Sequence, residues 1–173
     1  MAATKKKADT KKRSQDKVEQ TEMRSVSAIE LLEADHQEVD GFFDEYENLE
    51  DADEKERMTL KICLALTIHT QIEEEIFYPA ARDAIENAKL IDEAIVEHAS
   101  AKQLIAEIEE MDPSDELYDA KVKVLGEQVR HHVEEEEDEL FPEIKSSELD
   151  LEALGKKMAE RKAALLKETT KEK

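Results

Sequence analysis

Two histidine–glutamate pairs have the residue types and the spacing that metal binding requires. His69 precedes Glu73 by four residues, and His132 precedes Glu136 by four. Residues four apart on an α-helix lie on one face, so each pair can present an imidazole and a carboxylate in the same direction. A proline follows ten residues after each of these histidines. The repeated spacing indicates two copies of one structural unit.

Two further histidines occupy matching positions ahead of the pairs. His36 precedes His69 by 33 residues, and His98 precedes His132 by 34 residues. Both His36 and His98 stand among apolar residues that recur at steps of three and four, which is the pattern of a helix face turned toward a core. Each half of the chain therefore predicts a helix with one histidine, a turn, and a helix with the histidine–glutamate pair.

The helices that must position these residues can be placed from the same periodicity. Apolar residues at helical spacing predict four helices, at about 26–50, 54–78, 88–111 and 115–141. Two helical hairpins in succession make an all-α fold, an antiparallel up-down-up-down four-helix bundle. An amphipathic segment at about 148–167 predicts an additional C-terminal helix that packs beside the bundle or mediates self-association.

Local signals set the expected helix ends. Ser25 or Ser27 can cap the first helix and Ser114 the fourth, because a serine side chain accepts hydrogen bonds from the free N–H groups of the first turn. Pro79 is expected to loosen or end the second helix, and Pro142 to end the fourth. Proline has no backbone N–H, and its ring clashes with the preceding turn.

The short loops between these helices place all four histidines at one level of the bundle. Each lies roughly 13–15 Å from the same end, at a rise of about 1.5 Å per residue. Four imidazoles and two carboxylates are costly to bury without partners, and a bound cation removes that cost. The sequence therefore predicts a metal site. Its expected ligands are the six side chains on inward faces: His36, His69, Glu73, His98, His132 and Glu136.

The donor types narrow the choice of metal. Imidazole and carboxylate without thiolate favour iron, manganese or zinc. Two carboxylates at the centre of four helices favour a pair of metal ions that share them. If both ions are six-coordinate iron with a bridging oxide or hydroxide, about two positions stay open for a small exogenous ligand. An open position separates a reactive site from a purely structural one.

Composition narrows the class of protein. The chain has 173 residues, of which 41% are charged, with three glycines, three prolines and no tryptophan, as expected for one helical domain. A net charge of −21 argues against a nucleic-acid-binding body. No apolar run approaches the roughly 18 residues of a membrane span. A lysine-rich start without an apolar stretch, and a single cysteine, favour a cytoplasmic protein without an internal disulfide.

The charge is unevenly distributed, and this sets the expected domain organisation. Residues 1–18 hold seven Lys or Arg and two Asp. We expect a disordered basic tail at 1–22, the four-helix bundle at 23–145, and the C-terminal amphipathic helix with a frayed end at 146–173. The tail is the one candidate contact for nucleic acid or an anionic surface. No particular protein partner is indicated.

Four motifs carry a resemblance to a known family. They are DHQEV around His36, HTQIEEEIFYP at His69, EHASAK around His98 and HHVEEEEDELFP around His132. Over about residues 27–143 the chain resembles the hemerythrin-like, HHE cation-binding family. The resemblance implies an antiparallel four-helix bundle around a non-haem di-iron centre. It implies the same six ligands for two iron ions that carboxylates and an oxo or hydroxo group bridge.

The chain departs from the oxygen-carrying hemerythrins at two positions. Those proteins supply a second histidine four residues after the histidine of the third helix, where this chain has Lys102. They also place the last carboxylate five residues after its histidine, at Glu137 here, whereas the spacing of the first pair favours Glu136. A missing imidazole leaves a further open position, which disfavours stable, reversible oxygen carriage.

We therefore predict a metal-binding protein that binds or senses a small ligand (O2, NO or peroxide) or iron itself. Two alternatives stay open. One is a di-iron enzyme with peroxidase-like or ferroxidase-like turnover. The other is a bundle in which the metal has a structural role, while the basic tail and the C-terminal helix contact partners. Metal content, and an optical change with O2 or peroxide, distinguish the three.

The polar side chains beside the predicted ligands are expected to be exposed to solvent. Glu74, Glu135 and His131 are expected to face solvent. Glu97 neighbours His98 and is expected to be solvated, with support of the metal site, or a further ligand, as the alternative. Cys63 is expected to be a packed thiol rather than a redox switch.

Overall fold

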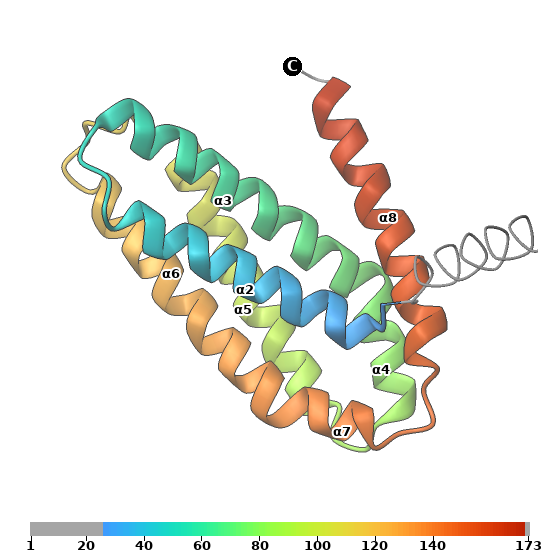
Figure 1. Cartoon of the computed structure of the whole chain (residues 1–173). Helices are drawn as coiled ribbons and strands as arrows, with labels where there is room; N and C mark the ends of the chain where they lie inside the picture. The colour runs from blue at the N-terminus through green and yellow to red at the C-terminus, as the bar shows by residue number, and fades with distance from the viewer. Residues whose placement is uncertain (1–25, 172–173) are drawn as a thin grey trace, which may run out of the picture.

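The protein folds as the antiparallel four-helix bundle expected from its sequence. The computed structural model describes residues 26–171 and contains only helices and loops over that range. The expected basic tail and Ser25 lie outside the described residues. Four long helices run up and down in chain order (Figure 1). They are α2 (Ala28–Tyr46), α3 (Ala52–Ile72), α5 (Lys89–Glu109) and α6 (Tyr118–Glu135).

Capping explains where two of these helices begin and why a third begins late. Ser27 caps α2, with its side chain bonded to the N–H of Glu30 and the Glu30 carboxylate bonded back to the N–H of Ser27. Asp51 caps α3. The prediction of Ser114 as a cap was wrong: its N–H and hydroxyl both donate to Asp112, a local turn that competes with helix, and α6 starts at Tyr118.

Neither proline ends its helix, so the prediction for Pro142 was wrong and Pro79 only loosens its helix. After α3 come η1 (Glu73–Phe77) and α4 (Tyr78–Ala84), and after α6 come η2 (Glu136–Leu140) and α7 (Phe141–Lys145). Both η segments are π-helical turns, in which the N–H bonds five residues back. This wider turn accommodates the missing N–H and the ring of the proline that follows, and the helix continues.

The interior has two apolar clusters with a polar layer between them. One cluster lies toward the start of α2 and the prolines, and includes Leu32, Phe77 and Phe141. The other lies toward the opposite end of the bundle and includes Phe43 and Leu125. The predicted histidine level falls between the two. Cys63 is a buried free thiol in the second cluster, and burial raises its pKa to about 12, as expected for a packed cysteine.

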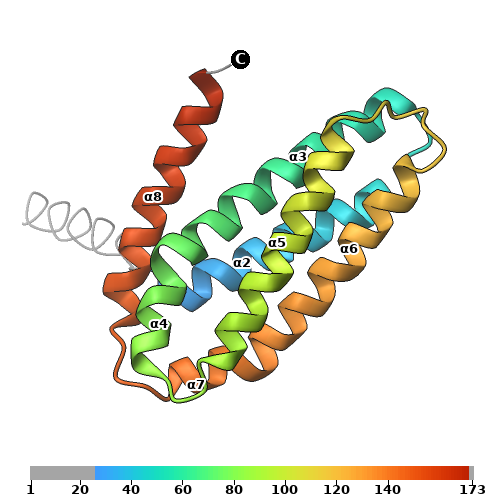
Figure 2. The same ribbon diagram turned by 180° about the vertical axis from the view of Figure 1, so that it is seen from behind.

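The additional C-terminal helix, α8 (Leu151–Lys171), lies outside the bundle and packs against α2 and α3. Leu154, Met158 and Leu165 are its buried anchors. Figures 1 and 2 show most of it beside the bundle and its C-terminal end diverging from the bundle. Self-association is therefore not needed to bury the apolar face of α8.

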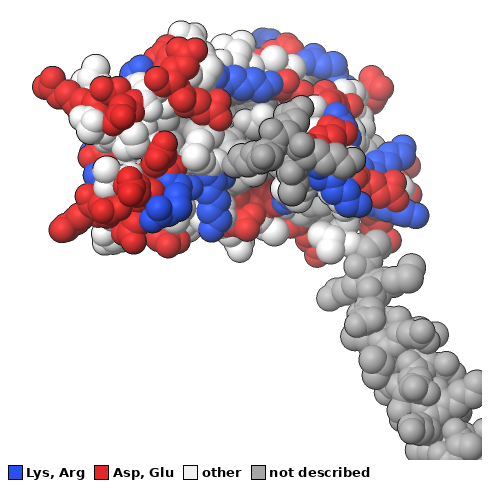
Figure 3. Space-filling view, turned by 90° about the horizontal axis from the view of Figure 1, so that it is seen from above, with Lys and Arg blue, Asp and Glu red and all other residues white. Residues whose placement is uncertain are grey.

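Two surface properties agree with the composition. Acidic side chains cover much of the face seen in Figure 3, with basic side chains interspersed among them. Within residues 26–171, no helix has both the length and the apolar character that a membrane crossing needs.

Candidate metal centre

All six predicted ligands meet inside the bundle, at the polar layer between the apolar clusters. The α2 helix supplies His36, α3 and the start of η1 supply His69 and Glu73, α5 supplies His98, and α6 with the start of η2 supplies the last two. Every one of the six is buried: His36, His69, Glu73, His98, His132 and Glu136. The axial level inferred from loop lengths was therefore correct.

The histidines form two pairs, one from each half of the chain. The rings of His36 and His69 lie 4.9 Å apart between centroids, and those of His98 and His132 lie 4.7 Å apart. In the second pair the two Nε2 atoms are 3.1 Å from each other. Each pair thus turns two nitrogen donors toward a common point.

The two carboxylates connect the histidine pairs. Glu73 Oε2 lies 3.2 Å from His69 Nε2 and 3.3 Å from His98 Nε2. Glu136 Oε2 lies 3.3 Å from His36 Nε2 and 3.6 Å from His132 Nε2. Each carboxylate therefore contacts one histidine of each pair. This arrangement makes two overlapping ligand groups, within each of which the donor atoms lie within 4.8 Å of one another.

Several of these buried metal-ligating atoms have no hydrogen-bond partner among residues 26–171. They are His36 Nε2, both ring nitrogens of His69, both oxygens of Glu73 and Glu136 Oε2. Unpaired buried polar groups are rare and cost free energy, and here they face one another rather than being scattered. A cation coordinated by these atoms removes the cost, so the residues fit a metal.

A second ring of carboxylates surrounds the histidines. Each Nδ1 atom faces a carboxylate: Glu97 at 2.7 Å from His132, Glu137 at 2.8 Å from His36, Glu74 at 3.0 Å from His98 and Asp35 at 3.5 Å from His69. A carboxylate on Nδ1 fixes the imidazole tautomer and leaves the Nε2 lone pair free for a metal. The expectation that Glu74 and Glu97 are solvated was wrong.

The sequence positions of this second ring of carboxylates follow a simple rule. Each of the four carboxylates lies one residue away from a predicted ligand. A residue adjacent to an inward position lies on the flank of its helix, about 100° away, where it can reach a ring on the neighbouring helix. In a chain with so many acids, that signal was hidden by the acidic residues on the outer faces.

Comparison with known proteins agrees with this geometry. The family model described as the Hemerythrin HHE cation binding domain matches residues 27–144. The chain belongs to the hemerythrin HHE cation-binding family.

Two similar proteins extend the comparison. A crystal structure of a hemerythrin HHE cation binding domain-containing protein from Mycobacterium kansasii superposes with a TM-score of 0.71 at 25% identity, covering 81% of this chain and 87% of that one. A DNA nickase from Nostoc sp. (strain PCC 7120) is 27% identical over 127 residues, 73% of this chain and 36% of that protein. The HHE chain thus spans about a third of the nickase.

The two departures from the oxygen carriers have structural explanations in this HHE chain. Lys102 donates to both oxygens of Glu74 at 2.6 Å, so it holds the partner of a site histidine and does not replace a ligand. Glu136 is the inward carboxylate, as predicted, whereas the Glu137 side chain is 40% exposed and bonds His36 from outside. His131 is 65% exposed, in agreement with the solvated interpretation.

Tyr78 is a site residue that the sequence reasoning missed. Its hydroxyl donates to Glu136 Oε1 over 2.9 Å and lies 3.3 Å from His98 Nε2. Five residues separate Tyr78 from Glu73, which on an α-helix places the two side chains about 140° apart. The π-helical turn η1 narrows that angle and brings both to the same side. A π-helical turn is invisible to a search for α-helical periodicity.

The electrostatics of the centre favour a positive charge. Burial alone lowers the pKa of an imidazole, but Glu73 and Asp35 outweigh it and raise the pKa of His69 to about 10. Burial also opposes the charge on His132, and Glu97 and Glu136 raise its pKa. Burial raises the pKa of a carboxyl, yet His69 and His98 hold the pKa of Glu73 well below its usual range. In the absence of a metal, protons on the imidazoles supply the positive charge that the carboxylates favour, and a bound cation can replace these protons.

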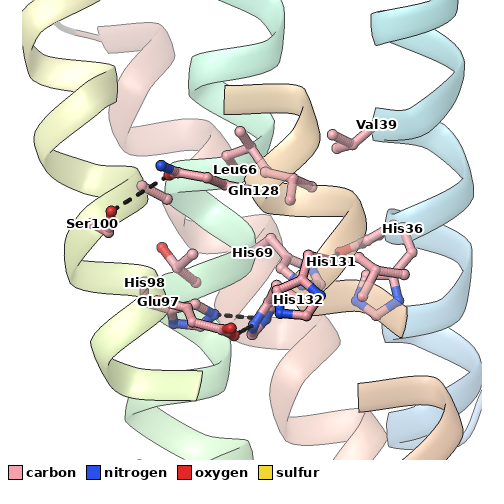
Figure 4. Close-up of a pocket in the computed structure, with 15 residues that line it drawn as sticks. His36, Val39, Leu66, His69, Glu97, His98, Ser100, Gln128, His131 and His132 are labelled. Atoms are coloured by element: carbon pink, nitrogen blue, oxygen red, sulfur yellow. Dashed lines mark hydrogen bonds and ion pairs between the residues drawn. The ribbon is translucent and has the colours of Figure 1, made fainter. Parts of the chain in front are cut away.

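A cavity of about 190 Å³ adjoins the HHE centre. The site histidines and His131 line one side of it, and Val39, Leu66 and Ala101 are among its other walls. It reaches the exposed residues Ser100 and Gln128, whose side chains bond each other across α5 and α6 at 3.5 Å (Figure 4). The cavity therefore extends from the site histidines to exposed residues of α5 and α6.

Proposed function

We propose that this chain binds two iron ions at the HHE centre and uses them to bind or sense a small ligand: O2, NO or peroxide. The observation that carries the proposal is that each carboxylate, Glu73 and Glu136, contacts a histidine of both pairs. A carboxylate shared in this way is the usual bridge between two metal ions in a helical bundle.

Each half of the chain then contributes to both ions. His36 and His69 would hold one ion and His98 and His132 the other, and Glu73 and Glu136 would be shared between them. Two imidazoles and two carboxylate oxygens for each ion, without thiolate, suit iron, with manganese or zinc as substitutes. The bound metals supply the coordination of the small ligand.

The protein around the centre controls what reaches the metals. The cavity walls Val39, Leu66 and Ala101 favour small neutral molecules such as O2 and NO over anions. The Tyr78 hydroxyl lies inside the centre and donates its one hydrogen bond to Glu136 Oε1, which holds that carboxylate in place. The four carboxylates on Nδ1 keep the histidines oriented.

Turnover of peroxide or oxidation of ferrous iron is the second candidate function. The cavity of about 190 Å³ favours it, because it adjoins the site histidines and has room for a small substrate such as peroxide beside them. A metal with a purely structural role is the remaining alternative. The nicking of DNA by the Nostoc relative gives no support for that activity here, since a net charge of −21 repels a polyanion.

Optical spectroscopy on the full chain tests the proposal. The protein is loaded with ferrous iron without air, and spectra are recorded before and after O2, NO or peroxide. A new charge-transfer band at a fixed stoichiometry supports ligand binding, and repeated consumption of peroxide supports the enzyme. If iron is bound and none of the three ligands changes the spectrum, the metal is structural and the proposal is wrong. Zinc-loaded protein is the control.

A further inference from the structure

The α8 helix lies outside the residues that match the HHE family, yet it contacts the elements that hold the metal centre. The family match ends at residue 144, and α8 begins at Leu151. Its apolar anchors pack beside the start of α2. A Cβ atom added at Gly155 would lie 2.3 Å from the backbone oxygen of Val26, so the two segments touch without room for a side chain. This close approach fixes the position of α8 along α2.

One charged residue of α8 reaches toward the centre through a buried acid. Lys162 forms an ion pair with Asp35 Oδ1, and the other oxygen of Asp35 lies 3.5 Å from His69 Nδ1. Asp35 is buried, and it directly precedes His36 in the chain. A continuous line of contacts therefore runs from α8 through Asp35 to His69.

The preceding residue of α8, Arg161, contacts the η1 turn. Arg161 binds both oxygens of Glu75, at 2.7 and 3.1 Å, and Gln71 donates to Glu75 as well, at 2.7 Å. Glu75 belongs to η1, the π-helical turn that starts with the bridging residue Glu73. Two neighbouring side chains of α8 thus hold Asp35 on α2, which faces His69, and the η1 turn, which presents Glu73.

We propose that α8 is a positioning element for the metal centre, with Lys162 as its principal positioning residue. The proposal rests on the proposed function, in which His69 binds a metal through Nε2. Lys162 holds Asp35 in place, with Asp35 Oδ2 3.5 Å from His69 Nδ1, where its charge favours the tautomer with the proton on Nδ1 and leaves the Nε2 lone pair for the metal. Without the ammonium group, Asp35 becomes a buried acid facing only a histidine, and its orientation is no longer fixed.

The charge of Lys162 is the feature that matters, so the variants isolate it. Lys162→Met removes the charge and keeps the length of the stem, Lys162→Arg keeps a cation, and Lys162→Gln is a second neutral variant should Met disturb packing. Lys157→Met is the matched control, because Lys157 is exposed on the same helix. All variants are made in the full chain and compared by far-UV circular dichroism.

The main measurement is the rate at which bound metal passes to a chelator. Replacement of a group that orients a metal-binding histidine typically weakens binding by about 10–100-fold, so we expect a more remote residue to give about three- to tenfold faster loss. Lys162→Arg should restore slow release, and Lys157→Met should match the unchanged protein. Equal release from Lys162→Met and the unchanged protein overturns the proposal, as does equal acceleration by Lys157→Met.

A double-mutant cycle separates positioning from general packing of α8. Asp35→Asn removes the group through which Lys162 acts, so Lys162→Met should add little to metal loss in an Asp35→Asn background. Additive effects of the two changes mean that Lys162 acts by another route, and the proposal is then wrong.

A metal-free measurement keeps this test independent of the proposed function. The Nδ1–H proton of His69, observed by NMR in the metal-free chain, should shift in Lys162→Met and return in Lys162→Arg. If the unchanged protein binds no metal, the proposed function fails, while this signal still decides whether Lys162 orients His69. If the His69 signal is the same in Lys162→Met and in the unchanged protein, this result alone overturns the positioning role.

Discussion

The Tyr78 hydroxyl donates a 2.9 Å hydrogen bond to Glu136 Oε1, which joins the two halves of the internal repeat inside the metal centre. Tyr78 follows the π-helical turn η1, and Glu136 begins the turn η2. The two irregular turns are therefore coupled through the side chains that they place in the centre. Burial, followed by Glu73 and Glu136, raises the pKa of Tyr78 well above its usual value, so this hydroxyl keeps its proton.

We predict that Tyr78→Phe weakens metal binding without unfolding the bundle. The change leaves Glu136 Oε1 without its donor and frees the carboxylate to rotate, which should lower metal affinity by about tenfold. The control is Tyr46→Phe, which removes a similar bond, to Asp119, at the far end of the bundle. Competition with a chelator measures both variants. Equal affinity in Tyr78→Phe and Tyr46→Phe would show that Tyr78 does not orient Glu136.

Two adjacent histidines provide the sharpest test of the ligand assignment. His132 is buried in the centre, whereas His131 points to solvent and pairs with Glu135 at 3.4 Å. We expect His132→Ala to lower the metal bound per chain after reconstitution and His131→Ala to leave it unchanged. Elemental analysis gives both numbers. Equal losses in the two variants would mean that the wrong face of α6 was assigned to the centre.

Access to the metals should depend on the cavity between α5 and α6. Ala101 is part of its wall, and Ala101→Leu places three additional carbon atoms beside the histidines. We predict that the variant keeps its metal but reacts several-fold more slowly with NO in stopped-flow spectroscopy. Ala106→Leu, on the exposed face of the same helix, should react at the original rate. If Ala106→Leu reacts slowly with NO, or if Ala101→Leu reacts at the original rate, the cavity is not the route to the metals.

Metal binding should release protons at neutral pH. The pKa of His69 is raised to about 10 in the metal-free protein, so at pH 7 its ring is protonated and must lose a proton to bind through Nε2. Since pH 7 lies below that pKa, apparent metal affinity should rise as pH is increased from 6 toward 8. Calorimetry in buffers of different ionisation enthalpy counts the protons. Affinity that is independent of pH contradicts the protonated state of His69.

The sequence predicted the bundle and the six converging side chains because both follow from α-helical periodicity. His36 and His98 stood on apolar stripes, and short loops aligned them with His69 and His132. These are local rules combined with a fixed rise per residue, and the core of the bundle obeys them.

The parts that were missed depend on contacts between helices or on departures from regular helix. Tyr78 enters the centre only because η1 is a π-helical turn, and the same geometry carries the helix past Pro79. The pairing of Asp35 with both His69 and Lys162 joins residues far apart in the chain. Neither relationship can be predicted from the spacing of apolar residues. The carboxylates that face the Nδ1 atoms could not be distinguished in the sequence from the many acidic residues on the outer faces.

The central claim is that the chain holds two metal ions between two histidine pairs. The most direct measurement is the number of metal ions per chain after anaerobic reconstitution with ferrous iron and removal of unbound metal. We predict two iron ions per chain in the unchanged protein and a marked loss in Glu73→Gln, because Glu73 contacts a histidine of both pairs. Less than one iron per chain in the unchanged protein would contradict the di-iron assignment.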